Sequence, residues 1–381
     1  MIRSTVAHVD LAALQANFRA IQAMVGAPRI IAVVKANAYG HGAPRVALAL
    51  ERAGATMLAC ADIEEGIMIR QAGVRVPILV FGALSVSDLD GLFEFSLTPT
   101  ISTPGAAKAV QAAAARRGTT IGYHLKIDTG MNRLGFRHDN LRRTLPDLMS
   151  SPNLRLEAVY THFASADVPE STSFNEQRER FESAWAVVCG MLAERGIDRA
   201  GVMRHASNSA ALLRDSRVWY DAVRPGLLLY GIVPPPLAST IPLTPVMSLT
   251  SRVVAVKGLR PGEGVGYGWR FQTDSPRTVA VVPAGYADGL DTRLGGRGHV
   301  LIRGQRAPIV GAVSMDMITV DVTNLGDVQP GDEVVLLGRQ GHESWQQIDA
   351  REIAAAIGTI PWEIVCRLGT RIERQYEEGG D

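Results

Sequence analysis

The chain has 381 residues, 46% of them hydrophobic, which is enough for a large core and indicates two domains. Its 39 basic and 38 acidic residues leave a formal net charge of +1, so the sequence carries no electrostatic footprint for nucleic acid or an acidic membrane surface. No apolar run approaches the about 20 residues of a membrane span, and residues 1–11 lack the apolar core of a signal peptide. The three cysteines fit neither a disulfide framework nor a zinc site, so we expect reduced thiols in a cytoplasmic protein: Cys60, Cys189 and Cys366.

Residues 1–240 alternate short β-rich runs with helical stretches, which predicts βαβ units and a parallel sheet. Eight such runs predict a closed (β/α)8 TIM-type barrel. A doubly wound open sheet is the alternative, but it normally shows a glycine-rich fingerprint after its first strand. The runs are Ile30–Ala36, Met57–Ala61, Pro77–Gly82, Leu97–Ser102, Ile121–Asp128, Leu156–Ala164, Val202–Asn208 and Ala222–Gly231. The clearest helical stretches are Leu11–Val25, Pro44–Ala53, Pro104–Arg117 and Ser173–Arg195.

A proline-rich stretch from Val233 to Pro245 ends this alternation and indicates a domain seam. Beyond it, turns containing Pro-Gly and Gly-Asp separate further strands, so residues 241–381 are predicted to form a mostly antiparallel β domain. About the first 10 residues are free to pack with that domain. The expected strands are Met247–Val256, Thr278–Pro283, His299–Ile302, Met317–Val322 and Glu333–Leu337, followed by one helix, Ile348–Ile357.

Lys35 ends the first apolar run, and active sites of (β/α)8 barrels lie at the carboxyl ends of the strands. A buried ammonium is costly, and a desolvated lysine becomes a nucleophile suited to Schiff-base chemistry. From position alone, the Lys35 side chain could equally extend to solvent at the barrel rim.

The segment around Lys35 reads Ala32-Val33-Val34-Lys35-Ala36-Asn37-Ala38-Tyr39-Gly40-His41-Gly42. It resembles the cofactor-lysine signature of bacterial alanine racemases. The barrel, the proline-rich seam, the β-rich second domain and the total length extend this resemblance over nearly the whole chain. The resemblance implies a pyridoxal-phosphate-dependent amino-acid racemase that interconverts L- and D-alanine and supplies D-alanine for peptidoglycan. Lys35 would hold pyridoxal 5′-phosphate as a Schiff base.

The phosphate of such a cofactor is commonly held by the loops after strands seven and eight. A helix beginning near Ser209 would direct free N–H groups at an anion, although an ordinary helix cap at Asn208 and Ser209 is the alternative. The resemblance implies phosphate contacts from Tyr39, Asn208, Ser209, Gly226 and Leu227.

The same resemblance implies that Arg224 faces the pyridine nitrogen and that His205 holds Arg224 in place. Many pyridoxal enzymes place a carboxylate there. An arginine is always charged and only donates, so it keeps the nitrogen unprotonated and favours proton exchange over transamination. For an isolated arginine, a salt bridge at a strand end is the alternative.

Racemisation is most direct with two bases on opposite faces of Cα. The resemblance implies Lys35 and Tyr267, the latter in Gly264-Val265-Gly266-Tyr267-Gly268. A free tyrosine has a pKa near 10, so a neighbour must ease its ionisation, and His162 is the family's candidate beside the cofactor. Because Lys35 and Tyr267 lie in different domains, the family's head-to-tail homodimer would bring them together.

The substrate carboxylate needs a cation, and Arg133 offers a bidentate fork. Lys126 matches a position commonly carbamylated in the family, which would orient Arg133. Met315 matches a residue whose backbone N–H contacts the carboxylate, and Tyr286 matches a tyrosine that lines the entrance. All of these roles are implied by the resemblance.

Two positions depart from the family pattern: Ser314 stands where cysteine is frequent, and Trp362 where a tyrosine usually contacts the phosphate. Trp362 supports the alternative of a broader alanine and serine racemase. A barrel-type decarboxylase would pair the ring nitrogen with a carboxylate, and a non-catalytic pyridoxal phosphate carrier would lack the residues beyond Leu243. We expect no metal, because no His/Cys pair with ligand spacing occurs near the carboxyl terminus.

Overall fold

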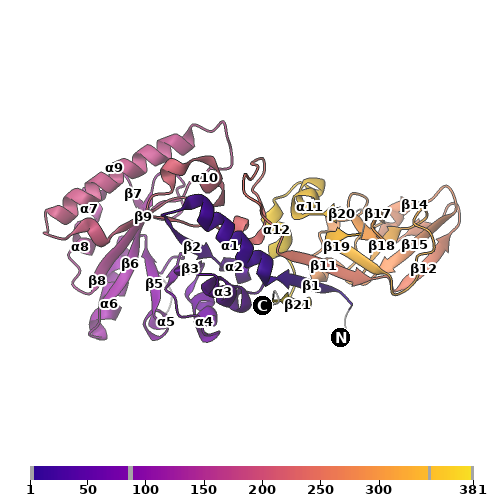
Figure 1. Ribbon diagram of the computed structural model, residues 1–381, viewed down its shortest axis with the longest axis horizontal. Coiled ribbons are helices and arrows are strands. Elements are labelled where there is room, and N and C mark those ends of the chain that lie inside the picture. Colours follow the sequence, from indigo (N-terminus) through magenta and orange to yellow (C-terminus); the bar gives the residue numbers. More distant parts are fainter. Residues whose placement is uncertain (1–3, 85–88, 342–344, 379–381) are drawn as a thin grey trace.

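The computed structural model describes residues 4–84, 89–341 and 345–378, so residues 1–3 of the amino-terminal segment considered above lie outside it. Figure 1 shows an elongated molecule, with a helix-covered barrel at one end and a β-sheet domain at the other.

Eight strands form the barrel, and every neighbouring pair is parallel. The ring closes because β10 pairs with β2, with Ala222 opposite Arg29 and Val223 opposite Ile30. The predicted TIM-type barrel is therefore confirmed. Its strands are β2 (Arg29–Val33), β3 (Met57–Cys60), β4 (Ile78–Val80), β5 (Leu97–Ile101), β6 (Ile121–Asp128), β8 (Leu154–Tyr160), β9 (Met203–His205) and β10 (Ala222–Val223).

Local sequence explains the helices around the barrel. Asp10 accepts a hydrogen bond from Ala13 N–H and so caps α1, while Thr103 caps α6, whose first residue is proline. The helices of this half are α1 (Leu11–Val25), α2 (Lys35–Tyr39), α3 (Ala43–Arg52), α4 (Ile63–Gln71), α5 (Asp90–Glu94), α6 (Pro104–Arg116), α7 (Leu141–Thr144), α8 (Pro146–Met149), α9 (Ser173–Ala193) and α10 (Ser209–Arg214). The short strand β7 (Phe136–Arg137) pairs with β6, and the 3-10 turns are η1 (Arg199–Gly201), η2 (Ser216–Val218) and η3 (Leu227–Tyr230).

Seven of the eight barrel strands end earlier than predicted, and the first and the eighth shape the barrel mouth. The first stops at Val33, because the chain then enters a left-handed turn that begins after Lys35. The eighth stops at Val223 instead of Gly231, because Pro225 cannot donate to a strand ladder and the next residues close into η3. Both early endings place backbone turns at the barrel mouth.

The second domain is a sheet whose strand order is β12-β15-β18-β17-β16-β19-β11-β1-β21, with β20 on β19. The described pairs are antiparallel except β1 with β21, which confirms the predicted architecture. The strands are β1 (Val6–Asp10), β11 (Met247–Arg252), β12 (Ala255–Leu259), β15 (Arg277–Val282), β16 (His299–Ile302), β17 (Gln305–Val310), β18 (Ile318–Asp321), β19 (Glu333–Gln340), β20 (Gln346–Ile348) and β21 (Glu373–Glu377). A separate hairpin joins β13 (Gly264–Val265) and β14 (Phe271–Gln272), and the 3-10 turns are η4 (Tyr267–Trp269), η5 (Tyr286–Asp288) and η6 (Thr292–Leu294).

Two helices follow the sheet strands where the sequence predicted one. The predicted helix is α11 (Ala350–Ile357), and α12 (Pro361–Cys366) is additional. The helix α12 packs on α2 and β21 packs on α1, so the second domain covers the turn that carries Lys35.

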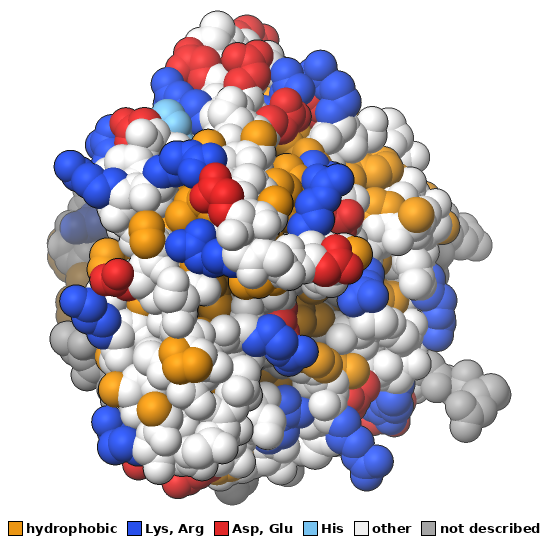
Figure 2. All heavy atoms as spheres, turned by 90° about the vertical axis from the view of Figure 1, so that its left-hand side faces the viewer, with side chains coloured by type: hydrophobic (Ala, Val, Ile, Leu, Met, Phe, Trp, Pro, Cys, Tyr) orange, Lys and Arg blue, Asp and Glu red, His pale blue; other side chains and the backbone are white. Residues whose placement is uncertain are grey.

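The barrel end of the molecule carries positive and negative side chains interspersed, as Figure 2 shows, in keeping with the balanced net charge. No helix in the described ranges is both long and apolar enough to cross a membrane.

Candidate active site

Lys35 lies directly after β2, at the start of a left-handed turn. The four residues that follow it, Ala36 to Tyr39, have φ between 51° and 54°. Left-handed backbone is unfavourable for residues with a Cβ, so this turn depends on its surroundings. It holds the Lys35 amine at the carboxyl end of the barrel, where active sites of this fold lie.

The signature residues after Lys35 build the turn. The Asn37 side chain accepts a hydrogen bond from Ala43 N–H at 2.8 Å and so holds the start of α3. Gly40 approaches the second domain so closely that a Cβ there would lie 2.1 Å from the Val365 carbonyl oxygen. A Cβ at Gly42 would lie 1.8 Å from the Tyr376 hydroxyl. The glycines therefore let the two domains meet at the lysine turn.

Burial lowers the pKa of Lys35, and the guanidinium of Arg133 lowers it further. Arg224 acts in the same direction, while Glu65 and Cys366 oppose the shift. A lysine with a lowered pKa holds more of its amine in the neutral, nucleophilic form.

The turns after β9 and β10 form a cradle next to Tyr39. Asn208 caps α10, and Ser209 Oγ accepts hydrogen bonds from Gly226 N–H at 3.0 Å and Leu228 N–H at 3.4 Å. A Cβ at Gly226 would lie 2.5 Å from the Tyr39 hydroxyl, so only glycine leaves this space open. Leu227 follows in η3. The predicted phosphate residues thus come together.

Arg224 is buried beside the cradle. Its Nη2 donates to the carbonyl oxygens of Thr161 at 2.8 Å and Ala206 at 2.9 Å, and lies 3.3 Å from His162 Nδ1. Its Nη1 donates to His205 Nδ1 at 2.8 Å. Burial lowers the pKa of Arg224 to about 10, so the side chain stays charged at neutral pH. Nε takes part in none of these contacts.

A second histidine, His124, supports Arg224 through the predicted one, His205. An arginine only donates, so His205 Nδ1 accepts and its Nε2 donates to His124 Nδ1, 3.0 Å away. Burial lowers the pKa of His124 to about 3 and that of His205 well below its usual range, so both stay neutral. Sequence reasoning missed His124, although it stands two residues before Lys126 on β6 and therefore shares its face of the strand.

Lys126 completes a group of cations with Lys35, Arg133 and Arg224. It is buried, and desolvation together with Arg133 lowers its pKa to about 8. Within the described ranges none of the four pairs with a carboxylate, and no cluster of ligating side chains suits a metal ion. Such a group of cations is suited to anionic ligands.

Three predicted residues of the second domain are exposed in the single chain. Tyr267, Tyr286 and Met315 are 76%, 45% and 51% exposed, and β14, just after Tyr267, lies at the end of the molecule opposite the barrel (Figure 1). Trp362 differs, because α12 packs on α2 and Trp362 lies half-buried against the core.

Comparisons with known proteins agree with this arrangement. Family models described as the alanine racemase N-terminal and C-terminal domains match residues 9–234 and 246–376. Alanine racemase from Sorangium cellulosum is 42% identical over 99% of this chain and all of its own length, and that from Halothermothrix orenii is 40% identical over 98% and 97%.

Solved structures give the same result. Alanine racemase from Streptomyces lavendulae superposes with a TM-score of 0.91 at 34% identity, over 100% of this chain and 98% of that one. The Bacillus anthracis enzyme with bound L-Ala-P has a TM-score of 0.88 at 35% identity, over 100% and 97%. With two family models covering both domains and full-length relatives above 30% identity, the chain belongs to the alanine racemase family.

Proposed function

We propose that the protein interconverts L-alanine and D-alanine with pyridoxal 5′-phosphate as cofactor. The observation that carries the proposal is the lowered pKa of Lys35, held at the barrel mouth beside a cradle for an anion. Its relatives are named alanine racemases. The D-alanine would serve peptidoglycan synthesis in the cytoplasm, where the free thiols of Cys60, Cys189 and Cys366 would stay reduced.

The residues present fit this cofactor. A covalent link to Lys35 is favoured by its lowered pKa, and the phosphate suits the cradle of Tyr39, Asn208, Ser209, Gly226 and Leu227. Its ring nitrogen suits the Nε donor of Arg224, with His162 alongside. When bound, the cofactor delocalises the charge that develops as the Cα proton leaves.

Arg224 limits that delocalisation. A permanently charged donor cannot accept a proton, so a ring nitrogen facing it stays unprotonated. His205 and His124 hold the guanidinium in one orientation. Arg224 donates to His205 Nδ1, so His205 Nε2 carries the proton and donates to His124 Nδ1. We therefore assign His205 and His124 as positioning residues for proton exchange without transamination.

Two bases on opposite faces of Cα move the proton. Lys35 would be one of these bases, and Tyr267 of a second copy would be the other. Residues 1–240 would form the cofactor-binding barrel and residues 241–381 the domain that supplies the second base in a head-to-tail homodimer. The 76% exposure of Tyr267 supports this arrangement, because the side chain is free to enter another chain's barrel.

The substrate carboxylate would bind Arg133, oriented by a carbamate on Lys126, with Met315 N–H and Tyr286 contributed by the second copy. A lowered pKa of about 8 supports the carbamate, because CO2 adds only to a neutral amine.

A broader alanine and serine racemase is the second candidate, and Trp362 favours it. This indole on α12 stands at the predicted phosphate position and has one N–H donor but no hydroxyl, so both cofactor retention and pocket shape would differ from those of tyrosine-bearing relatives.

The test is a racemisation assay on purified protein loaded with pyridoxal phosphate. Starting separately from L-alanine and D-alanine, both reactions are expected to reach equal amounts of the two enantiomers. Lys35→Ala should abolish the reaction and the cofactor absorbance, whereas Lys108→Ala, an exposed position on α6, should change neither. Cofactor-loaded protein that leaves both enantiomers unchanged would rule the proposal out.

A further inference from the structure

Residues 367–372 connect α12 to β21 and form a strap that runs along the turn η5. Gly369 N–H in the strap donates to the Asp288 carbonyl oxygen of η5 at 3.1 Å. A Cβ at Gly289 would lie 2.5 Å from the Arg367 carbonyl oxygen, so the two segments touch backbone to backbone.

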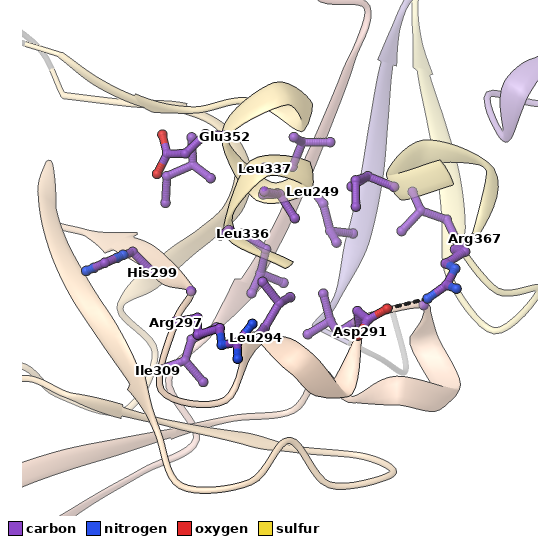
Figure 3. A pocket seen from close by; sticks show the side chains of 18 residues that line it. Leu249, Asp291, Leu294, Arg297, His299, Ile309, Leu336, Leu337, Glu352 and Arg367 are labelled. Atoms are coloured by element: carbon purple, nitrogen blue, oxygen red, sulfur yellow. Dashed lines mark hydrogen bonds and ion pairs between the residues drawn. The ribbon is translucent and has the colours of Figure 1, made fainter. Parts of the chain in front are cut away.

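The strap is held at both of its ends. At the start, Arg367 pairs with Asp291, which follows η5 beside a small apolar cavity of the β domain (Figure 3). At the other end, Arg374 of β21 donates from Nη2 to the Leu368 carbonyl oxygen at 2.8 Å and from Nε to the Gly40 carbonyl oxygen at 3.1 Å. The position of the strap is therefore fixed relative to both η5 and the lysine turn.

Within the strap, Arg371 joins two segments with one guanidinium. Its Nε and Nη2 donate to Asp288 Oδ1 at 3.2 Å and 3.1 Å, and its Nη1 donates to Asp316 Oδ1 at 2.9 Å. Asp288 is buried, and its Oδ2 accepts from Gly285 N–H at 3.0 Å. Charge-assisted hydrogen bonds are strong, and a guanidinium keeps its donors in one plane. Arg371 thus fixes η5 relative to the turn that contains Asp316.

These two segments contain two of the predicted substrate residues. Met315 precedes Asp316 in a turn that Ser314 closes, since Ser314 N–H donates to the Met317 carbonyl oxygen at 3.0 Å. The turn meets η5 where Tyr286 N–H donates to the Ser314 carbonyl oxygen at 3.0 Å. None of these hydrogen bonds uses the Met315 N–H or the Tyr286 hydroxyl.

We propose that Arg371 is a positioning residue for substrate binding, because it holds Tyr286 and the Met315 N–H in one relative orientation. The inference rests on the proposed function, in which both groups enter the barrel of a second copy. Without the charged link of Arg371, binding of the substrate has to order the two turns as well, and that ordering reduces the affinity.

Steady-state racemisation by the cofactor-loaded protein tests this role. We expect Arg371→Gln to raise the KM for L-alanine roughly 10-fold and to change kcat by less than about 2-fold, because a contact made equally in ground and transition states affects KM alone. The dissociation constant of pyridoxal phosphate should stay as in the parent protein. Arg306→Gln, which breaks another ion pair of the β domain, with Glu352, should leave KM and kcat unchanged.

Asp316→Ala is the second variant, since Arg371→Gln takes a partner from the buried Asp288 carboxylate and can lower stability. Asp316 is exposed, and its removal breaks the same link without leaving a buried charge. Asp316→Ala should also raise KM, and it should add little when combined with Arg371→Gln, because both changes remove one contact.

An unchanged KM in Asp316→Ala, a fall in kcat at unchanged KM, or weaker cofactor binding in either variant would each overturn the role of Arg371. The parent protein separates the two conclusions. If it racemises alanine, these results bear on Arg371 alone, whereas an inactive parent contradicts the proposed function and this inference with it.

Discussion

Only four of the 381 residues are lysines, and two of them, Lys35 and Lys126, lie at the candidate site. Both have lowered pKa values for the same two reasons, burial and nearby guanidinium groups. The remaining lysines, Lys108 and Lys257, are exposed. This scarcity makes lysine chemistry in the protein unusually easy to assign.

Lys126 is expected to form a carbamate. Because its pKa is about 8, the neutral amine increases as the pH rises through 8, and CO2 adds only to that form. Cofactor-loaded protein in 13C-bicarbonate should therefore show a carbamate 13C resonance that grows between pH 7 and pH 9. Lys126→Gln should remove the resonance and Lys108→Gln should leave it, and a resonance present in Lys126→Gln would assign it to another amine.

The buried histidines are expected to make the protein sensitive to acid. His41 and His124 have folded-state pKa values of about 4 and about 3, below the usual 6.5, so the unfolded chain takes up protons first as the pH falls. The contribution of these histidines to the free energy of unfolding is therefore fully present above pH 6.5. Below pH 6.5 the free energy of unfolding decreases by about 1.4 kcal/mol per pH unit for each histidine. Urea unfolding at pH 7, 6 and 5 measures this slope.

The control compares the same substitution at a buried and at an exposed histidine. His124→Asn should make the dependence shallower, whereas His299→Asn, at an exposed strand residue, should leave it as in the parent protein. Equal slopes for His124→Asn and the parent would mean that His124 is protonated in the folded state.

Among elements, the left-handed turn from Ala36 to Tyr39 is the least expected from sequence. Helical propensity favours alanine in right-handed helices, yet here contacts from the second domain hold four residues at positive φ, including Arg374 Nε donating to the Gly40 carbonyl oxygen at 3.1 Å.

Ala36→Gly is expected to stabilise the cofactor-free protein by roughly 1 kcal/mol, because glycine adopts φ of 53° without the Cβ penalty. Ala112→Gly, at an exposed position inside right-handed α6, should destabilise it by about 0.5–1 kcal/mol. Chemical denaturation of the two variants compares the same substitution in opposite backbone conformations. Destabilisation by both would argue against strain in the turn.

The sequence predicted those helices and strands whose apolar residues recur at regular spacing. Each of the eight predicted barrel runs overlaps an observed strand, and α1 has the predicted bounds, because its apolar spacing and Asp10 cap are local features. Strands β1 and β21 were not predicted, because both are specified by pairing with strands that lie far away in the sequence. The helix α12 was also missed, since six residues are too few for a periodic pattern.

The same limit applies to the candidate site. The motifs identified Lys35, Arg224 and the cradle, since they stand at the ends of predictable strands. His124 was missed because it is mid-strand, and its contact with His205 joins β6 to β9 across the barrel.

At the scale of the whole molecule, the proposed site would combine residues from both domains. The barrel has Lys35 and its group of cations, while the β domain exposes large side chains, among them Tyr267, Trp269 at 65% and Met317 at 47% exposure. Exposed apolar groups of this size are typical of interaction surfaces. A two-fold dimer that places each β domain on the other chain's barrel would complete two identical sites.

The most direct test combines two inactive variants in one dimer. Lys35→Ala and Tyr267→Phe chains, co-expressed with different affinity tags, are purified as the mixed dimer and assayed for conversion of L-alanine to D-alanine. If each site takes Lys35 from one chain and Tyr267 from the other, the mixed dimer contains one intact site and one doubly altered site, and it should show about half of the parent activity. A mixed dimer as inactive as either variant alone would contradict the shared two-base site.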